Sequence, residues 1–321
     1  MNGACRRRAA AIDCGTNSIQ LLIADLSVDN SSERVELREL ARVTEVVRLG
    51  RDILRTPILA PDLADHARRT LIEFADIISA HDVQQTRMCL TWISRSGCEL
   101  RPVVELATSL GLNPEMISGR LEAELAYVGA TSDLPPGKRY LVADIGGGSM
   151  QLVTGTATPE NSVSLELGCL RLTGEFLHGD PPTHEQQACA RRFISHRLLS
   201  AFDRLPTFSK IELVGLSEAV FTVAAVSLGK QPGHHARLTQ SQVASAAARI
   251  LSMSLAERTQ LPAVNPKILL VMPACALVVD ELVNFVQAPL TYSRADILDG
   301  IARSLWPTSS DRSPPASPLE C

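Results

Sequence analysis

The fold is decided by a pattern that occurs twice, in Asp13-Cys14-Gly15-Thr16-Asn17-Ser18-Ile19-Gln20-Leu21 and in Asp144-Ile145-Gly146-Gly147-Gly148-Ser149-Met150-Gln151-Leu152. Both copies read D-x-G-x-x-S-x-Q-L. A short apolar run precedes each copy, at 9–12 and 140–143, and another follows its turn. This arrangement indicates a strand, a tight turn containing glycine, and a second strand. The sequence therefore predicts two matching β-hairpins.

The residues of both turns are of types that bind phosphate together with a metal ion. An aspartate at the end of a strand can hold a hard cation such as Mg²⁺, and we expect Asp13 and Asp144 to do so. Glycines let backbone N–H groups approach phosphate oxygens, and Thr, Asn and Ser add side-chain donors. No Lys follows the glycines, so neither copy is a Walker loop, and for one copy alone a plain hairpin turn would explain the pattern equally well. The predicted phosphate-binding residues of the turns are Gly15, Thr16, Asn17, Ser18, Gly146, Gly147, Gly148 and Ser149.

Length and composition limit the class of protein. The chain has 321 residues, 45% of them hydrophobic, and this length favours two domains over one. The net charge of −4 provides no basic field that would recruit nucleic acid or an anionic membrane. Apolar runs are too short to span a membrane, and the eight cysteines lack zinc-site spacing, so we expect a soluble cytoplasmic protein with free thiols. Cys14 is the thiol that falls inside the predicted site.

Strand and helix patterns predict that each hairpin opens an α/β lobe. In the first lobe we expect strands at 33–47 and 86–91 and helices at 61–81, 100–110 and 120–131. The order recurs after the second hairpin, with strands at 162–167, 210–214 and 288–292 and helices at 185–203, 217–228, 240–254, 273–286 and 295–306. The predicted units are residues 1–130, residues 131–306, and a disordered tail rich in Ser and Pro at 307–321.

Duplicated lobes that open with D-x-G hairpins resemble the actin, sugar-kinase and heat-shock ATPase superfamily. Within it, the chain is most similar to the exopolyphosphatase and guanosine pentaphosphate phosphohydrolase family, from residue 9 to about residue 305. The likeness rests on six motifs in the family's order: AIDCGTNSIQLLIADL at 11–26, VVRLG at 46–50, MISGRLEAELAYVGA at 116–130, VADIGGGS at 142–149, LELGCLRLT at 165–173 and SRADILDGIA at 293–302.

The resemblance implies both a fold and a reaction. The fold would be a two-lobed, duplicated RNase H-like α/β structure with an interlobe cleft. The reaction would be hydrolysis of the terminal phosphate of inorganic polyphosphate or guanosine pentaphosphate, assisted by Mg²⁺ or by Mn²⁺ in its place. The resemblance also implies a homodimer.

Two further site residues follow from the resemblance. Glu122 matches the family's proposed catalytic base, and it falls in the first turn of a predicted helix, where the helix dipole favours an ionised carboxylate. Arg95 matches an arginine directed at phosphate, which a planar guanidinium suits well. The alternatives are a glutamate that only stabilises the helix start and an ordinary surface arginine.

The chain departs from the family at several positions. Met150 and Gln151 stand where the family has Thr and Glu, and Glu218-Ala219 replaces a Gly-Thr turn. The family's R-A-D is absent from NPKILLVMPACALVVDEL at 265–282, and its serine-alanine-threonine stretch is Trp92-Ile93-Ser94 here. These changes favour an alternative hypothesis, a catalytically weakened regulator that binds polyphosphate or the alarmone. A sugar kinase is less favoured, because no adenosine-type Gly-Gly turn is evident in the second lobe.

Overall fold

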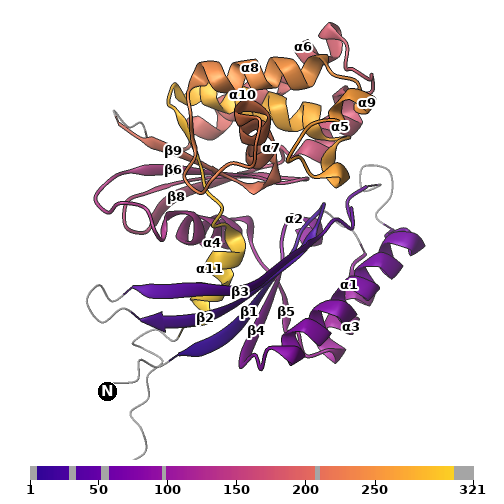
Figure 1. The fold of residues 1–321 in the computed structure, drawn as a ribbon, viewed down its shortest axis with the longest axis vertical. Coiled ribbons are helices and arrows are strands. Elements are labelled where there is room, and N and C mark those ends of the chain that lie inside the picture. The colour runs from indigo at the N-terminus through magenta and orange to yellow at the C-terminus, as the bar shows by residue number, and fades with distance from the viewer. Residues whose placement is uncertain (1–5, 29–33, 52–57, 96–98, 207–209, 307–321) are drawn as a thin grey trace, which may run out of the picture.

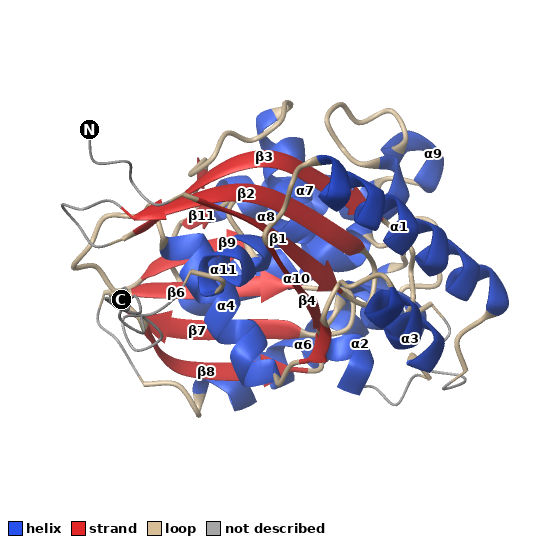
Figure 2. Ribbon diagram, turned by 90° about the horizontal axis from the view of Figure 1, so that it is seen from below, coloured by secondary structure: helices blue, strands red, loops and turns tan. Residues whose placement is uncertain are grey.

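The structure is a computed structural model that describes residues 6–28, 34–51, 58–95, 99–206 and 210–306. It contains two mixed β-sheets, one in each lobe, with helices between and outside them (Figures 1 and 2). The predicted tail at 307–321 lies outside the described residues. Among the described residues, no helix is long and apolar enough to cross a membrane.

The first sheet has the strand order β3-β2-β1-β4-β5. β1 and β2 form the first predicted hairpin, β3 pairs antiparallel with β2, and β4 and β5 follow as parallel strands. The bounds of these strands are β1 Arg7–Cys14, β2 Ile19–Val28, β3 Val35–Glu45, β4 Gln85–Leu90 and β5 Pro114–Met116.

The second sheet repeats the same plan, with the order β10-β11-β9-β6-β7-β8. Its hairpin is β6-β7, β8 pairs antiparallel with β7, and β9 and β11 run parallel to β6. The expected duplicated α/β fold is therefore confirmed. The bounds are β6 Tyr140–Ile145, β7 Met150–Gly155, β8 Pro159–Leu165, β9 Glu212–Leu216, β10 Arg237–Leu238 and β11 Leu290–Tyr292.

The hairpin strands are buried on both faces, which explains their apolar sequences. In β1, Ala9 and Ala11 face the core between the lobes, whereas Ala10 and Ile12 face the outer core of the first lobe. Helices α1 (Pro61–Ala80) and α3 (Arg101–Ser109) cover that outer face. Alternate residues thus supply both cores, as the period of a strand requires.

Two helices lie between the sheets and hold the lobes together (Figure 1). These are α4 (Gly119–Thr131) and α11 (Ile297–Ser304). They cross so closely that a Cβ on Gly129 would lie 1.8 Å from the carbonyl oxygen of Asp296, and a Cβ on Gly300 would lie 1.9 Å from that of Leu125. α11 also packs on β1 and β2 of the first sheet, so this last described helix lies against the first lobe, and the expected division at residue 130 stays a prediction.

The helices between residues 169 and 286 cover the outer face of the second sheet. The long ones match the predicted ranges to within a few residues. Sequence reasoning missed the short elements, including α2 (Trp92–Arg95), β5, α5 (Cys169–Phe176), β10, α9 (Leu255–Arg258) and the 3₁₀ turn at Pro266–Ile268. The long helices of this lobe are α6 His184–Phe202, α7 Ser217–Leu228, α8 Gln240–Ser252 and α10 Met272–Val286.

Candidate functional site

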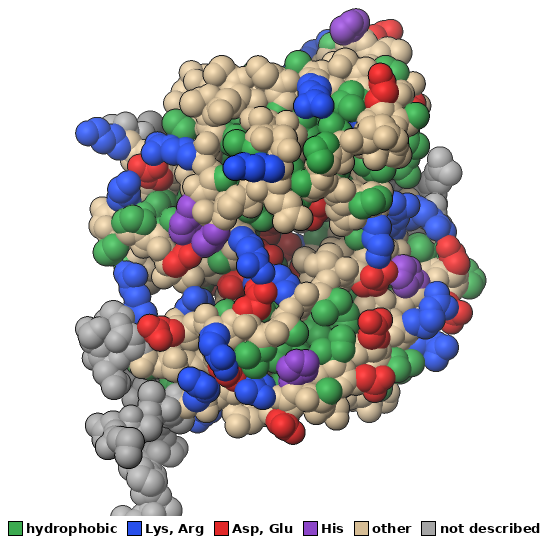
Figure 3. Space-filling model, viewed as in Figure 1, with side chains coloured by type: hydrophobic (Ala, Val, Ile, Leu, Met, Phe, Trp, Pro, Cys, Tyr) green, Lys and Arg blue, Asp and Glu red, His purple; other side chains and the backbone are tan. Residues whose placement is uncertain are grey.

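A pocket of about 330 Å³ lies between the two lobes and receives residues from both predicted hairpins. Figure 3 shows the hollow at the centre of the molecule, with acidic side chains inside it. Every predicted residue of the two turns lines this pocket, together with Asp13, Asp144 and Glu122. Arg95 is the predicted site residue that does not line it.

The two turns have the same local geometry. The Gly15 N–H donates to the Ser18 carbonyl oxygen at 2.9 Å, and the Gly146 N–H donates to the Ser149 carbonyl oxygen at 2.9 Å. The strands also pair in the same register, with Asp13 opposite Gln20 and Asp144 opposite Gln151. The repeated sequence pattern therefore corresponds to a repeated structure.

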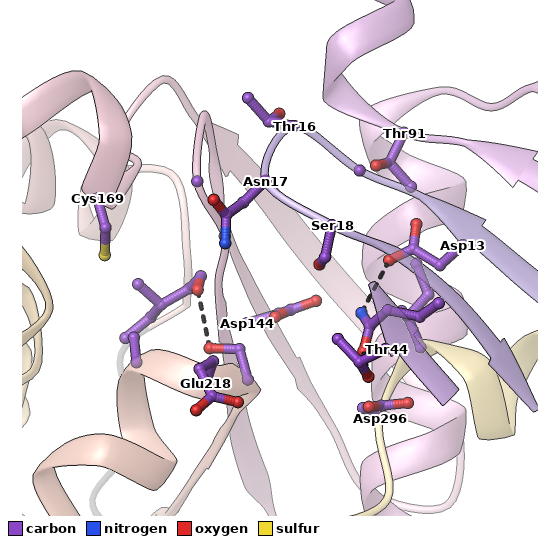
Figure 4. Close-up of a pocket in the computed structure, with 18 of the residues that line it drawn as sticks. Asp13, Thr16, Asn17, Ser18, Thr44, Thr91, Asp144, Cys169, Glu218 and Asp296 are labelled. Atoms are coloured by element: carbon purple, nitrogen blue, oxygen red, sulfur yellow. Dashed lines mark hydrogen bonds between the residues drawn. The ribbon is translucent and has the colours of Figure 1, made fainter. Parts of the chain in front are cut away.

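The turns approach each other across the pocket (Figure 4). A Cβ on Gly147 would lie 3.2 Å from the Cβ of Asn17 on the opposite turn. A Cβ on Gly148 would lie 2.3 Å from the Trp92 ring. Glycine is thus required at 148 for packing against α2, a role that sequence reasoning had not separated from phosphate binding.

Five carboxylates line the pocket: Asp13, Glu122, Asp144, Glu218 and Asp296. Burial, with the neighbouring charges of Glu122 and Asp144, raises the pKa of Asp13 well above its usual range. Burial and the charges of Glu122 and Asp296 raise the pKa of Asp144 to about 7. Oδ1 of Asp13 is buried without a hydrogen-bond partner. Carboxylate oxygens are the ligands that a hard divalent cation prefers, and such an ion would relieve the mutual repulsion of these groups.

Glu122 is held by the arginine that was predicted to contact phosphate. Nη2 of Arg95 donates to Oε2 of Glu122 at 2.6 Å, and Nη1 donates to the Ile117 carbonyl oxygen at 2.7 Å. Glu122 is only 6% exposed, and burial raises its pKa while the charge and hydrogen bond of Arg95 lower it. Ser118 caps α4 by accepting from the Leu121 N–H at 3.1 Å, which fixes the first turn that carries Glu122. In this structure Arg95 therefore orients Glu122, and a direct contact with phosphate stays a prediction.

Sequence reasoning missed the ion pair between Asp296 and Arg42 in the wall of the pocket. Arg42 donates to Oδ1 of Asp296 at 3.1 Å and to Oδ2 of Asp299 at 2.6 Å, which links β3 to the start of α11. Asp296 is the N-cap of α11 and accepts from the Leu298 N–H. The signal for Asp296 was present in SRADILDGIA, as an aspartate directly before an apolar helix. No pattern in the neighbouring sequence pointed to Arg42, since its role comes from its contacts with Asp296 and Asp299, which are far away in the sequence.

Comparison with known proteins identifies the family. A model described as the Ppx/GppA phosphatase family matches residues 27–301. The chain belongs to this family. Exopolyphosphatase 2 of Mycobacterium tuberculosis is 34% identical, and the match covers 93% of this chain and 98% of that protein.

Solved structures agree with this assignment. A crystal structure of an exopolyphosphatase-like protein has a TM-score of 0.86 and 29% identity, covering 93% of this chain and 97% of that one. An exopolyphosphatase from Cytophaga hutchinsonii has a TM-score of 0.81 at 22% identity, covering 92% of this chain and 96% of that one, which shows a shared fold. The chain is thus a member of a family of phosphoanhydride hydrolases, as the motifs predicted.

Gln151 stands where the family has a glutamate, and its side-chain amide is hydrogen-bonded inside the pocket. Its Nε2 donates to Oγ of Ser149 at 2.8 Å and lies 3.4 Å from Oγ of Ser164. Gln151 is 1% exposed and faces the pocket. The amide donates to both hydroxyls, whereas a carboxylate would accept from them, so the substitution removes one negative charge and reverses the direction of these hydrogen bonds.

Glu218, the other acidic departure, lies at the start of α7 and points into the pocket (Figure 4). Ser217 before it has φ of +81°, a conformation that favours glycine, and its Oγ donates to the Ile145 carbonyl oxygen at 2.8 Å. Burial raises the pKa of the Glu218 carboxyl. A carboxylate here occupies the helix start, where an anion would otherwise bind.

The thiol predicted to belong to the site does not line the pocket. Cys14 points into the outer core of the first lobe and is 0% exposed. The side chain of a strand alternates between faces, so Cys14 turns away from the face that carries Asp13. Two other cysteines, Cys169 and Cys275, line the pocket instead.

Proposed function

We propose that this protein is an exopolyphosphatase that removes terminal phosphates from inorganic polyphosphate with the help of Mg²⁺. The observation that carries the proposal is one pocket that is closed by two equivalent glycine turns and lined by five carboxylates. A polyanion binds such a pocket only if its charge is neutralised, which divalent cations do. The names of the relatives support polyphosphate as the substrate.

Asp13, Asp144 and Asp296 are the residues that would hold Mg²⁺, which would neutralise phosphate charge when bound. The backbone N–H groups of the two turns, with Ser18 and Ser149, would bind the terminal phosphoryl oxygens. Phosphoryl transfer depends mainly on positioning and charge stabilisation, so these donors are sufficient to orient the reacting group.

Glu122 would orient and deprotonate the attacking water. Arg95 fixes the carboxylate and offsets part of the effect of burial, which favours the protonated acid. The pKa of Glu122 stays above its usual value because burial is the largest effect, and the Arg95 hydrogen bond holds the carboxyl group in one orientation.

Guanosine pentaphosphate is a second candidate substrate. The second-lobe side of the pocket is lined by the apolar side chains of Phe221, Ile268, Val271 and Tyr292. Inorganic polyphosphate has no group that would use such a surface, whereas a nucleoside has one.

A phosphate-release assay with a panel of substrates tests these proposals. Purified protein is incubated with Mg²⁺ and with polyphosphates of several lengths, guanosine pentaphosphate, or ATP plus a sugar. We expect phosphate release from polyphosphate that stops in EDTA and returns with Mg²⁺ or Mn²⁺. Tight binding of polyphosphate without release would instead support the regulator, and formation of ADP from ATP plus a sugar would support a kinase.

Two further properties are proposed from the family resemblance. We expect a homodimer, which light scattering of the purified protein would detect. We also expect a cytoplasmic protein, which fractionation of the producing cells would test.

A further inference from the structure

Two cysteines lie side by side in the wall of the cleft. Cys169 and Cys275 both line the pocket, both are free thiols, and each is only 4% exposed. Cys169 belongs to α5 and Cys275 to α10, and these helices pack against each other. Contact with the Cys169 thiol is the largest of the causes that raise the pKa of Cys275. The fold therefore brings together two thiols that are far apart in the sequence.

The backbone at Cys169 is hydrogen-bonded to the turn at 146–149. Its backbone N–H donates to the Gly146 carbonyl oxygen at 3.0 Å, and the next N–H, of Leu170, donates to that of Gly147 at 2.9 Å. The chain before Cys169 packs on the same turn, because a Cβ on Gly168 would lie 2.2 Å from the Gly147 oxygen. A shift of Cys169 must therefore also shift the turn at 146–149.

Cys169 is the member of the pair that faces the cleft at a helix start. Its sulfur points from the first residue of α5 toward the pocket (Figure 4). The deprotonated form of a thiol is the one that reacts with oxidants. Small solutes that enter the substrate cleft would reach this sulfur.

We propose that Cys169 and Cys275 form a disulfide in the presence of a peroxide, and that this bond displaces the turn at 146–149 and switches off phosphate binding. The formation of the bond depends only on the thiol pair. Its effect on catalysis rests on the function proposed above.

The reaction balances with hydrogen peroxide as the oxidant. The Cys169 thiol loses its proton and its sulfur attacks one peroxide oxygen; the O–O bond breaks, the leaving hydroxide takes up a proton to become water, and Cys169 becomes a sulfenic acid. The sulfur of Cys275 then attacks the Cys169 sulfur, the S–S bond forms, and the oxygen leaves as a second water. Two thiols are oxidised by two electrons, and one peroxide is reduced to two waters.

The other buried thiols of the first sheet do not offer this chemistry. Cys14 and Cys89 lie on neighbouring strands, but Cys14 faces the outer core and Cys89 faces the core between the lobes. Neither of them lines the pocket. Cys189 on α6 is more exposed, and it also lies outside the pocket, so it provides a matched control.

The test compares the wild type with Cys169→Ser, Cys275→Ser and Cys189→Ser. Each reduced protein is treated with hydrogen peroxide, quenched, and divided for peptide mapping, polyphosphate binding and phosphate release. In the wild type we expect a cross-linked 169–275 peptide and a fall in turnover of about tenfold to a hundredfold, as expected for a misplaced binding turn, with recovery in dithiothreitol. Cys189→Ser should behave as the wild type does. Cys169→Ser and Cys275→Ser should form no cross-link and should keep most of the activity that each has before treatment.

Several results would overturn the proposal. One is the absence of the 169–275 cross-link at peroxide levels that oxidise Cys189. Another is a cross-link that leaves both polyphosphate binding and turnover unchanged, and a third is equal inactivation of Cys275→Ser. If the reduced wild type releases no phosphate at all, the proposed function fails, but the cross-link and its effect on polyphosphate binding still decide this proposal.

Discussion

The pKa of Asp144 gives the most direct prediction, which concerns the stability of the protein without metal. Its folded-state pKa is about 7 against an ordinary value of 3.8, mainly because of burial. The folded state therefore holds the proton more tightly than the unfolded chain does. The stability that this group contributes is complete at low pH, and it is lost as the pH rises from about 4 to about 7.

The magnitude follows from the same two values. Each unit by which the folded and unfolded pKa differ is worth about 1.4 kcal/mol, so the loss from pH 4 to above pH 7 is about 4 kcal/mol. About 3 kcal/mol of it falls between pH 5 and pH 8. Asp144 keeps part of its surface toward the cleft, and water there reduces the effect, so about 1–2 kcal/mol is the expected loss.

The perturbation is Asp144→Asn, which keeps the shape of the side chain and removes the charge. Urea unfolding of both proteins in EDTA at pH 5 and pH 8 gives the four free energies of unfolding that are needed. We expect the wild type to lose stability over this range by about 1–2 kcal/mol more than the variant does. Mg²⁺ should restore the wild type at pH 8 and should restore the variant less, since the variant lacks one ligand. An equal pH slope for the two proteins in EDTA would refute the electrostatic account of the cleft.

Four further predictions follow from the contacts in the site. Glu122→Gln should lower turnover by about 10²- to 10⁴-fold with little change in polyphosphate binding, and near-normal phosphate release would remove Glu122 from the mechanism. Arg95→Met should shift the acidic limb of the pH–rate profile to higher pH, because the pKa of Glu122 rises when the arginine that lowers it is removed. Arg120→Met, which removes an exposed ion pair with Glu124, should leave this limb unchanged. Gln151→Glu should raise turnover if the missing carboxylate is what limits water positioning, and a fall would mean that its hydrogen bond to Ser149 matters more. Gly300→Ala should cost about 1–3 kcal/mol in urea unfolding because its Cβ meets the Leu125 carbonyl, whereas Gly233→Ala, which meets nothing within 4 Å, should be nearly neutral.

The sequence predicted the parts of this protein that depend on local patterns. Both hairpins, the long helices and the first-turn position of Glu122 follow from strand alternation, helical periodicity and the Ser118 cap, and the structure confirms them. The short elements were missed because a helix or strand of a few residues has too little periodicity to be recognised and is stabilised by its neighbours. α2 and α5 are examples: each packs beside the turn at 146–149, with Trp92 against Gly148 and Gly168 against Gly147.

The residues themselves determined that this chain has two equivalent glycine-containing turns and an acidic residue at the end of each leading strand. Only the tertiary structure decided what those residues meet. It paired Arg95 with Glu122, brought Asp296 from a distant part of the sequence into the pocket, turned Cys14 away from the site and packed the helices of Cys169 and Cys275 together. The physical reason is that turns and helix starts are governed by neighbours in sequence, whereas the pKa of a carboxylate and the partner of a thiol depend on groups that only packing brings close.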